Sequence, residues 1–462
     1  MSRPQVNKIL HSFPSPRFWR EKVADGSKLL ARQREIAKNQ PDADMELYVS
    51  LPFCLPTDPG HCGYCLFPVE SYQNQSQLDD YLDYLDREGQ LYLPYHQELS
   101  PVSIYIGGGT PNLLKNHHYA KLMTLIRRNF PKLKPETPIT LEGIPQLFSR
   151  DKLEAIKEAG ISRISMGAQQ MNLELTKLSG RKQKPEQIIN AVRWAKEIGL
   201  ECNVDLIFGW PQQTLATMEE DLLSLIELDV PHLTHYELNI GGPTDFSLNR
   251  RHELPSPELV KEMYHHSREL LAKHGYEQRT PYDFQKIHDR QDFIYEECRQ
   301  DYHYREVWGW GYAAISDFPS AEVGGGWTLM NWRKLHQYRE AIDAGQMPIE
   351  CAFQREAEDL RLSLIFRNMQ SLSINRQDYH RRFGSDIVQD DKPLWQAFEH
   401  LGLLNIAEND IKLSTEGGYY VPLMQIMLAE SRTETLVERH YQQLKRQAET
   451  SQDLTKNFQT AS

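Results

Sequence analysis

Short apolar segments rich in β-branched and aromatic residues alternate with segments of helical periodicity over much of the chain. Helices are predicted at 151–160, 185–199 and 217–229, and glycines stop the first two. The apolar segments are LYVSLPF (47–53), VSIYIGGG (102–109), ITLEGIP (139–145), RISMGAQ (163–169), CNVDLIFGWP (202–211) and HLTHYEL (232–238). Strands that alternate with helices form parallel βαβ units, so the pattern predicts an α/β barrel or part of one. An open doubly wound sheet is the alternative.

The ends of these apolar segments carry residues suited to chemistry. Each of the first five ends in, or is followed directly by, Gly, Pro, Cys, Gln or an acid rather than further apolar residues. In a barrel of parallel strands, binding and catalytic groups gather where each strand ends and the next loop begins. We therefore expect the functional site at this end of the strands.

The composition changes outside this alternation. Residues 1–45 are predicted to form an N-terminal extension, and residues 46–350 to form the barrel core with an extension of its own. Within that extension, residues 324–345 are predicted to pass from a loop into a helix. Helices followed by a hairpin predict a small helical, winged-helix-like domain at 351–431, and residues 432–462 are predicted to be a polar tail.

Charge and composition exclude several classes of function. The net charge is −12, which argues against binding to nucleic acid or to an anionic membrane. No apolar run approaches the ~18 residues needed to span a bilayer, and the N-terminal sequence lacks the layout of a signal peptide. We expect a cytoplasmic protein, in which clustered thiols serve metal binding or catalysis rather than disulfides.

Three cysteines lie close together after the first apolar segment, in FCLPTDPGHCGYCLF (53–67). Seven residues separate Cys54 from Cys62, and two separate Cys62 from Cys65. Each iron of a cubic iron–sulfur cluster needs a terminal ligand, so three cysteines would leave one iron open to a substrate or cofactor. A structural zinc site needs a fourth ligand, and His61, next to Cys62, would strain a tetrahedral site. From the spacing alone, a cluster, a zinc ion and coincidence all remain open.

A run of three glycines ends the second apolar segment, in IYIGGGTPN (104–112). Because glycine has no Cβ, such a run lets a ligand approach the backbone closely, although a tight turn is the structural alternative. The run matches neither the dinucleotide-binding pattern nor a phosphate loop. The glycine run and the cysteine loop each follow the end of a predicted parallel strand. Both are therefore positioned to contact the same ligand.

In order along the chain, YVSLPFC…CGYC, GGGTPN, EGIP, RISMGAQ, LSGR and NVDLIFGWPQQT resemble the radical S-adenosylmethionine (SAM) enzymes. The closer resemblance is to the oxygen-independent coproporphyrinogen III oxidase-like family. It runs from Tyr48 to Gly345 and continues more weakly through LRLSLIFRNM and IKLSTEGGYY. It implies a partial (β/α)6 barrel like part of a TIM barrel, with a C-terminal helical, winged-helix-like accessory domain. The implied partners are a tetrapyrrole or haem and an electron donor such as flavodoxin or ferredoxin, but no nucleic acid.

The resemblance also implies the cofactors. Cys54, Cys62 and Cys65 would ligate a [4Fe-4S] cluster, and the amine and carboxylate of SAM would chelate its fourth iron. Cleavage of SAM by the reduced cluster would give a 5′-deoxyadenosyl radical that abstracts hydrogen from the substrate. The residues implied to bind cofactor are Tyr48 beside the cluster, Gly108 and Gly109 at the methionyl amine, Glu142, Gln169, Arg181 at the carboxylate and Asp205 at the adenosine. Taken singly, each of these side chains also has an ordinary structural interpretation.

Three features depart from the family pattern. The usual spacing is C-x3-C-x2-C, so this loop is four residues longer, but a few extra residues cost little closure entropy and we expect the cluster to be retained. Phe67 stands where the oxidases carry a further cysteine, which favours the haem-chaperone and haem-methyltransferase branches. The chaperone motif H-N-x-x-Y-W is matched in HYREVW (303–308) only at His303 and Trp308, and we treat this match as chance.

The predicted function is therefore that of a radical SAM oxidoreductase acting on a tetrapyrrole. The alternatives are a haem chaperone without turnover, a haem methyltransferase, and a zinc-stabilised barrel without redox chemistry. Two segments rich in tyrosine and acids, 276–284 and 293–304, are candidates for the walls of a porphyrin-sized pocket. Aromatic residues of an ordinary core or surface explain them equally well.

Overall fold

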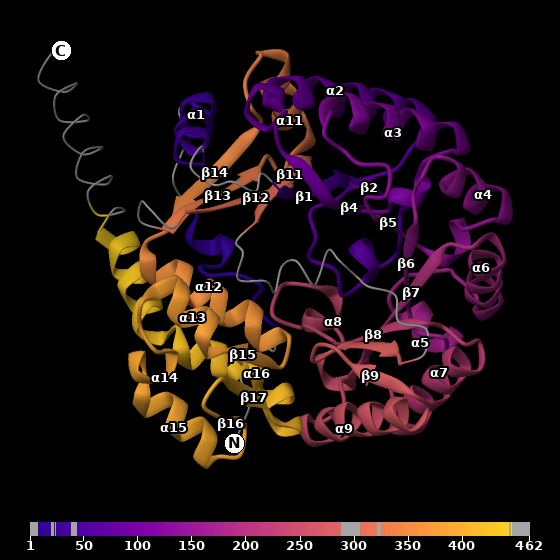
Figure 1. Cartoon of the computed structure of the whole chain (residues 1–462). Helices are drawn as coiled ribbons and strands as arrows, with labels where there is room; N and C mark the ends of the chain where they lie inside the picture. Colours follow the sequence, from indigo (N-terminus) through magenta and orange to yellow (C-terminus); the bar gives the residue numbers. More distant parts are fainter. Residues whose placement is uncertain are drawn as a thin grey trace, which may run out of the picture.

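The structure is a computed structural model of the chain, and it describes residues 8–19, 23, 25–37, 44–287, 305–320, 325–442 and 445. The segment 293–304 and its His303 lie outside these residues. A curved twelve-stranded sheet forms the centre of the described chain, with helices around its outside (Figure 1). Its strand order is β14-β13-β12-β11-β1-β4-β5-β6-β7-β8-β10-β9.

The six apolar segments form adjacent parallel strands at the middle of this sheet. They are β1 (Asp44–Leu51), β4 (Ser100–Gly108), β5 (Ile139–Gly143), β6 (Arg163–Gln169), β7 (Glu201–Phe208) and β8 (His232–Glu237). The predicted partial α/β barrel is thereby confirmed, and the open doubly wound alternative is not.

Helices between and after these strands cover the outside of the barrel. They are α2 (Gln75–His96), α3 (Asn116–Asn129), α4 (Arg150–Glu158), α6 (Pro185–Ile198), α7 (Leu215–Glu227) and α9 (Pro257–Lys273). Two short helices, α5 (Leu173–Leu178) and α8 (Asp245–Leu248), belong to a separate small apolar cluster against which Tyr64 packs. The predicted signals delimit α6, because Pro185 stands at its first turn and Gly199 ends it in a left-handed conformation with φ of 77°. No helix in the described part of the chain has the length and apolarity to cross a bilayer.

Further strands extend the sheet at both sides. The hairpin of β9 (Tyr276–Gln278) and β10 (Asp283–Lys286) adds antiparallel to β8. On the other side β11 (Glu306–Gly311) pairs parallel with β1, and the antiparallel strands β12 (Ile315–Ser320), β13 (Gly325–Asn331) and β14 (Ile349–Gln354) follow. The prediction of a loop at the start of 324–345 was wrong, because β13 occupies it; the predicted helix is α11 (Leu335–Asp343).

The barrel strands alternate between an apolar outer face and a polar inner face. In β6 and β7, Ile164, Met166 and Val204 are buried in the main apolar core, whereas Ser165 and Asn203 hydrogen bond to one another at 3.0 Å on the other face. Successive side chains of a strand point to opposite faces, so polar and apolar residues that alternate along the sequence lie on different faces of the sheet. The inside of this barrel is therefore a buried polar lumen.

The C-terminal region forms a helical unit with a small three-stranded sheet. Its elements are α12 (Ala357–Gln370), β15 (Ser373–Asn375), α13 (Arg376–Phe383), α14 (Ile387–Asp390), α15 (Lys392–His400), β16 (Leu404–Ile406), β17 (Asp410–Leu413) and α16 (Thr415–Leu428). The predicted hairpin corresponds to β16 and β17, which α16 follows. One of the predicted helices, α12, is buried over most of its surface.

An N-terminal segment, residues 8–19, lies against this C-terminal unit, and α1 (Gly26–Ala37) follows it. The side-chain amide of Gln425 in α16 accepts from the backbone N–H of Leu10 at 2.8 Å and donates to its carbonyl at 2.9 Å. The hydroxyl of Ser363 in α12 does the same for Phe13, at 2.9 and 2.8 Å. Buried side chains thus satisfy backbone groups that no regular structure pairs.

Candidate active site

The cysteine loop folds back on itself beside the end of β1. Cys54 ends the short strand β2 (Phe53–Cys54), and Cys62 ends a single 3₁₀ turn, Gly60–Cys62. The residues His61, Cys62 and Gly63 take positive φ values of 57°, 54° and 61°, which turn the chain sharply before Cys65. All three cysteines are half-buried and free.

The residues that lengthen this loop are fixed by contacts. The hydroxyl of Thr57 accepts a hydrogen bond of 3.2 Å from the backbone N–H of Cys62. A Cβ on Gly180, whose φ is +79°, would lie 2.7 Å from the carbonyl oxygen of Asp58. The longer loop therefore packs against the segment that carries Arg181, and only a glycine fits at that contact.

The three cysteine sulfur atoms do not all lie within 4.8 Å of one another. Among the described residues, the group whose ligand atoms all lie within 4.8 Å of one another is Asp79, His117 and His118, not the three cysteines. Four thiolates around a zinc ion would have sulfur atoms about 3.8 Å apart, given Zn–S bonds of about 2.3 Å. His61, the proposed fourth zinc ligand, is exposed to solvent. This arrangement disfavours the zinc alternative.

The thiols are electrostatically coupled. Burial raises the pKa of Cys54 to about 11, although a hydrogen bond of 3.3 Å from the Thr110 hydroxyl opposes the shift, and the neighbouring cysteines Cys62 and Cys65 raise it further. Burial likewise raises the pKa of Cys65. The charge of Arg181 lowers both values. Thiols of this kind are protonated near neutral pH, so binding of a metal centre would release protons.

The three consecutive glycines Gly107, Gly108 and Gly109 make contacts of two different kinds. Gly108 and Gly109 pack on the chain that leads to Cys54, because a Cβ on them would lie 2.7 Å from the Leu51 carbonyl and 2.6 Å from the Phe53 carbonyl. Gly107 faces the lumen instead. A Cβ there would lie 2.9 Å from Oε2 of Glu142 and 2.9 Å from the Tyr48 hydroxyl. The space beside Gly107 is a cradle that any other residue would fill.

Tyr48 and Glu142 meet on this inner face. The Tyr48 ring stacks on that of Tyr105 with centroids 6.1 Å apart, and the Tyr105 hydroxyl donates to Oε1 of Glu142 at 2.8 Å. Burial raises the pKa of Glu142 to about 7; hydrogen bonds from Tyr105 and from the Gly108 backbone oppose the shift, and the charge of Asp205 adds to it. Glu142 is therefore close to its point of ionisation at neutral pH.

Gln169 and Arg181 come together at the end of β6. Gln169 takes a φ of 67° after a bulge, and its side-chain nitrogen lies 2.7 Å from where a Cβ on Gly167 would stand. Arg181 is 7% exposed; it donates to the Gly167 carbonyl at 2.7 Å and to the Tyr64 hydroxyl at 3.1 Å. Arg181 is not a surface cation, and it joins the barrel to the cysteine loop.

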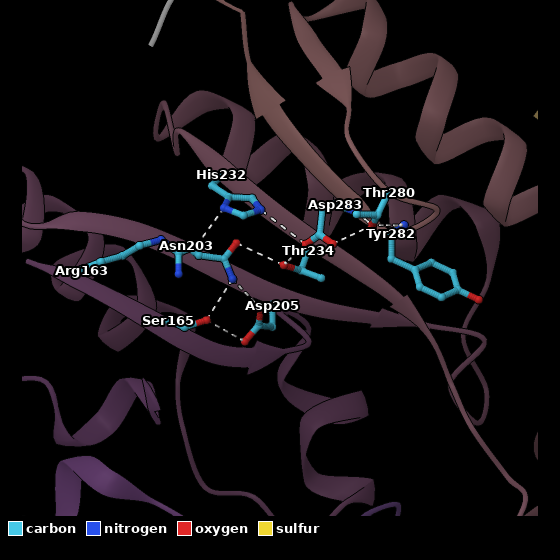
Figure 2. A network of polar contacts seen from close by, with 9 residues as sticks. All are labelled: Arg163, Ser165, Asn203, Asp205, His232, Thr234, Thr280, Tyr282 and Asp283. Atoms are coloured by element: carbon cyan, nitrogen blue, oxygen red, sulfur yellow. Dashed lines mark hydrogen bonds and ion pairs between the residues drawn. The ribbon is translucent and has the colours of Figure 1, made fainter. Parts of the chain in front are cut away.

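Asp205 lies deeper in the lumen, within a network of polar side chains (Figure 2). Asn203 donates to its Oδ1 at 2.6 Å, and Ser165 contacts its Oδ2 at 3.4 Å. Burial raises the pKa of Asp205 to about 6, against the lowering effects of Asn203 and of the charge on Arg163. The network fixes the orientation of this carboxylate.

A cavity of about 290 Å³ opens beside the cysteine loop. Its walls include Tyr64, residues 236–239 at and after the end of β8, and residues 280–283 before and in β10. The first tyrosine-rich segment, 276–284, thus contributes to a pocket wall. The sequence analysis did not single out Tyr64, although it stands within CGYC between two of the cysteines. It did not single out Asp283 either, whose one signal was the density of tyrosine and acids in 276–284.

Comparisons with known proteins agree with this arrangement. The family model of the radical SAM superfamily matches residues 59–225. The chain is 32% identical to the heme chaperone HemW of Escherichia coli over 235 residues, which are 51% of this chain and 61% of HemW. It is 26% identical to the oxygen-independent coproporphyrinogen III oxidase of Salmonella typhimurium over 423 residues, which cover 88% of this chain and 89% of that one.

The chain belongs to the radical SAM superfamily, in its HemN/HemW family. The match spans less than two thirds of HemW itself. The crystallised coproporphyrinogen III oxidase HemN of Escherichia coli superimposes with a TM-score of 0.78 at 23% identity, covering 91% of this chain and 96% of HemN. The fold of this radical SAM protein is therefore the HemN fold.

Membership implies a [4Fe-4S] cluster and SAM, and the residues present fit both. Three coupled thiols with a neighbouring guanidinium suit an anionic cluster, and they are spaced too widely for one ion. The cradle at Gly107 is bounded by the Glu142 carboxyl and the Tyr48 hydroxyl, which are partners for an amine.

Proposed function

We propose that this protein is a radical SAM enzyme that acts on a tetrapyrrole held in the 290 Å³ cavity. The observation that carries the proposal concerns Tyr64. It stands between Cys62 and Cys65, its hydroxyl accepts from Arg181 at 3.1 Å, and its side chain lines the cavity. A ligand in the cavity would therefore lie next to the metal centre. The volume of about 290 Å³ lies just below the range of about 300–1,000 Å³ typical of small-molecule pockets.

Cys54, Cys62 and Cys65 would hold the cluster. When bound, the cluster supplies one electron and SAM supplies a carbon radical that removes hydrogen from the substrate. Thr110, through its contact with the Cys54 sulfur, and Arg181, through its charge, would stabilise the thiolates. The cysteine loop would shield the centre from water.

The remaining site residues would bind SAM. Glu142 and the Tyr48 hydroxyl would receive the methionyl amine at Gly107, and the backbone at Gly108 and Gly109 would line it. Arg181 would hold the carboxylate, with Gln169 beside it, because a guanidinium presents parallel donors. Asp205 would face the adenosine. The barrel would thus bring an amine acceptor and a carboxylate donor to neighbouring strand ends.

The reaction class within the family is part of the proposal. Oxidative decarboxylation of propionate groups is the first candidate and radical methylation of the macrocycle is the second; an electron donor such as flavodoxin or ferredoxin would supply the electrons. A haem chaperone without turnover is the competing function. Phe67, which stands beyond Cys65 where the oxidases carry a cysteine, favours it, as does the similarity to HemW.

Anaerobic reconstitution with iron and sulfide tests the proposal. We expect a brown protein that releases 5′-deoxyadenosine from SAM in the presence of dithionite. Incubation with coproporphyrinogen III or haem, followed by mass spectrometry, would identify a product that has lost carbon dioxide or gained a methyl group. Stoichiometric uptake of haem with no product would favour the chaperone, and a colourless zinc protein would contradict both.

A further inference from the structure

The turn that follows β6 is held by side chains of other elements. It starts at Gln169, whose φ of 67° is uncommon for a residue that has a Cβ. The pairing of β6 with β7 shifts its register at the same place, between Gly167 and Gln169. The shape of this turn sets where the Gln169 side chain stands. It also sets the place of the Gly167 carbonyl, which accepts from Arg181 at 2.7 Å.

Asp221, on the outer helix α7, holds the middle of this turn. The residue is 5% exposed, and its Oδ2 accepts a hydrogen bond of 2.9 Å from the backbone N–H of Met171. The backbone N–H of Asn172, the next residue, donates to the same carboxylate. Burial raises the pKa of Asp221 to about 7, and these two N–H groups oppose the shift. Two successive peptide groups thus point at one carboxylate, which fixes their orientation.

Two buried glutamines tie the same turn to the end of β7. Nε2 of Gln170 donates to the Ile207 carbonyl at 2.5 Å, and its Oε1 accepts from Nε2 of Gln213 at 3.2 Å. Oε1 of Gln213 in turn accepts from the backbone N–H of Trp210 at 3.1 Å. Gln213 belongs to the motif NVDLIFGWPQQT, of which the site described above uses only Asp205. The network therefore gives this second part of the motif a place beside the first.

The side chains of Asp221, Gln170 and Gln213 are not themselves placed to bind a ligand. None of them is among the described residues that line the cavity. Their polar groups already have partners in the turn, at the end of β7 and in one another. Burying a carboxylate costs more than burying an apolar side chain, so its place on the buried side of α7 calls for a role that an apolar residue could not fill. Holding the backbone N–H groups of the turn is such a role.

We propose that Asp221, together with Gln170 and Gln213, is a positioning residue for SAM and acts through the turn that carries Gln169. The inference rests on the proposed function, because it takes Gln169 and Arg181 as the residues that bind SAM. A binding group contributes fully only when its neighbours fix its place, and a displacement of about 1 Å removes much of its contribution. Asp221 itself touches neither SAM nor the cysteines in this scheme.

Steady-state release of 5′-deoxyadenosine at varied SAM concentration, with dithionite as the reductant, tests this role. We expect Asp221→Asn to raise the KM for SAM by about ten-fold, with kcat within about two-fold of wild type. The amide keeps the size of the side chain but loses the charge that holds two N–H groups. Iron content should match that of wild type. Glu227→Gln makes the same kind of change at an exposed position of α7 and should behave as wild type.

Two further measurements keep the test independent of turnover and of one variant. Hydrogen exchange of the apoprotein should be faster in Asp221→Asn than in wild type for a peptide that spans 168–173, because the N–H groups of Met171 and Asn172 lose their acceptor. Gln213→Ala leaves the carboxylate in place and removes the hydrogen bond to Gln170. It should raise the KM for SAM in the same direction, and it serves where Asp221→Asn does not fold.

A lower melting temperature with an unchanged KM for SAM in the folded variants would overturn the inference, because the network would then stabilise the fold alone. Loss of iron with an unchanged KM would also overturn it, because the cluster rather than SAM would depend on the turn. A wild-type protein that binds SAM in equilibrium dialysis without cleaving it would contradict the proposed function, and the dissociation constants of the variants would then test the network. A wild-type protein that binds no SAM would overturn both.

Discussion

The Tyr105 hydroxyl donates a hydrogen bond of 2.8 Å to Oε1 of Glu142, across the neighbouring strands β4 and β5. Burial raises the pKa of Glu142 to about 7, and this hydrogen bond opposes the shift. The same carboxyl bounds the cradle at Gly107. A single phenol therefore helps to set the charge of the group proposed to receive the SAM amine.

Replacing Tyr105 by Phe should move this ionisation to higher pH. Loss of the hydrogen bond removes an interaction that favours the carboxylate, so the pKa of Glu142 should rise above about 7. The acidic limb of the pH profile for 5′-deoxyadenosine release should move in the same direction. Tyr119→Phe, on the outer helix α3, is the control. Identical profiles for both variants would contradict a link between Tyr105 and activity.

Replacing Glu142 by Gln should change how stability depends on pH. The pKa of Glu142 is raised from 4.5 to about 7 in the folded chain, so the unfolded chain loses this proton first and stability falls as pH rises through this interval. The variant should lack this loss, which is on the order of 2 kcal/mol. Urea unfolding of the apoprotein at pH 5 and pH 8 measures it. A constant difference between wild type and variant at the two pH values would contradict the expectation.

Cys62→Ala should lose the cluster. With one of three ligands gone, reconstituted protein should contain little of the iron found in wild type, and 5′-deoxyadenosine should not be released. Cys202→Ala is a matched control, because Cys202 is buried in the apolar core. Iron and sulfide analysis with absorbance spectra measures the outcome. Wild-type iron in Cys62→Ala would remove this residue from the ligand set.

Gly107→Ala should weaken SAM binding while leaving the cluster in place. The added Cβ would lie 2.9 Å from the ends of the Glu142 and Tyr48 side chains, which must then shift. Such a displacement of a positioned group should raise the dissociation constant for SAM by about ten-fold or more. Equilibrium dialysis with SAM and iron analysis on the same sample separate the two effects. Unchanged affinity would place the SAM amine elsewhere.

Gln425→Ala should release the N-terminal segment from α16. The variant loses both hydrogen bonds to Leu10, which stabilise the folded state by about 1–2 kcal/mol. Cleavage within residues 8–19 by a protease at low concentration should accelerate, whereas the barrel should resist. Gln442→Ala, at an exposed side chain, is the control. Equal cleavage rates would show that the remaining contacts, such as the hydrogen bonds of Ser363 to Phe13 and the packing of Phe13 and Trp19, fix the segment without Gln425.

The alternation of short apolar segments with segments of helical periodicity, together with the strand-end residues, made the barrel predictable. Glycines and prolines at the ends of helices such as α6 gave boundaries, and the motifs pointed to residues that the fold brings to one end of the sheet. The strands β11 to β14 were harder to predict, because glycine and tryptophan in 306–331 give neither a helical nor an alternating pattern. Their strand character comes from pairing with β1 and with one another.

Contacts between distant segments were not predictable from the sequence. Asp283 is one acid in a tyrosine-rich stretch until β10 pairs with β8 and brings it to Thr234. The longer cysteine loop gave no indication that Asp58 would pack on Gly180. Such long-range contacts depend on the assembled fold, and they cannot be predicted from the local periodicity of the sequence.

The attachment of residues 8–13 to α12 and α16 has a consequence for biosynthesis. Leu10 leaves the ribosome hundreds of residues before Gln425, its hydrogen-bonding partner. A nascent chain could form the strands β1 to β8 before the wall of the cavity that contains Lys8 and His11 is in place. The complete wall of the cavity would thus form only after α16 has been translated.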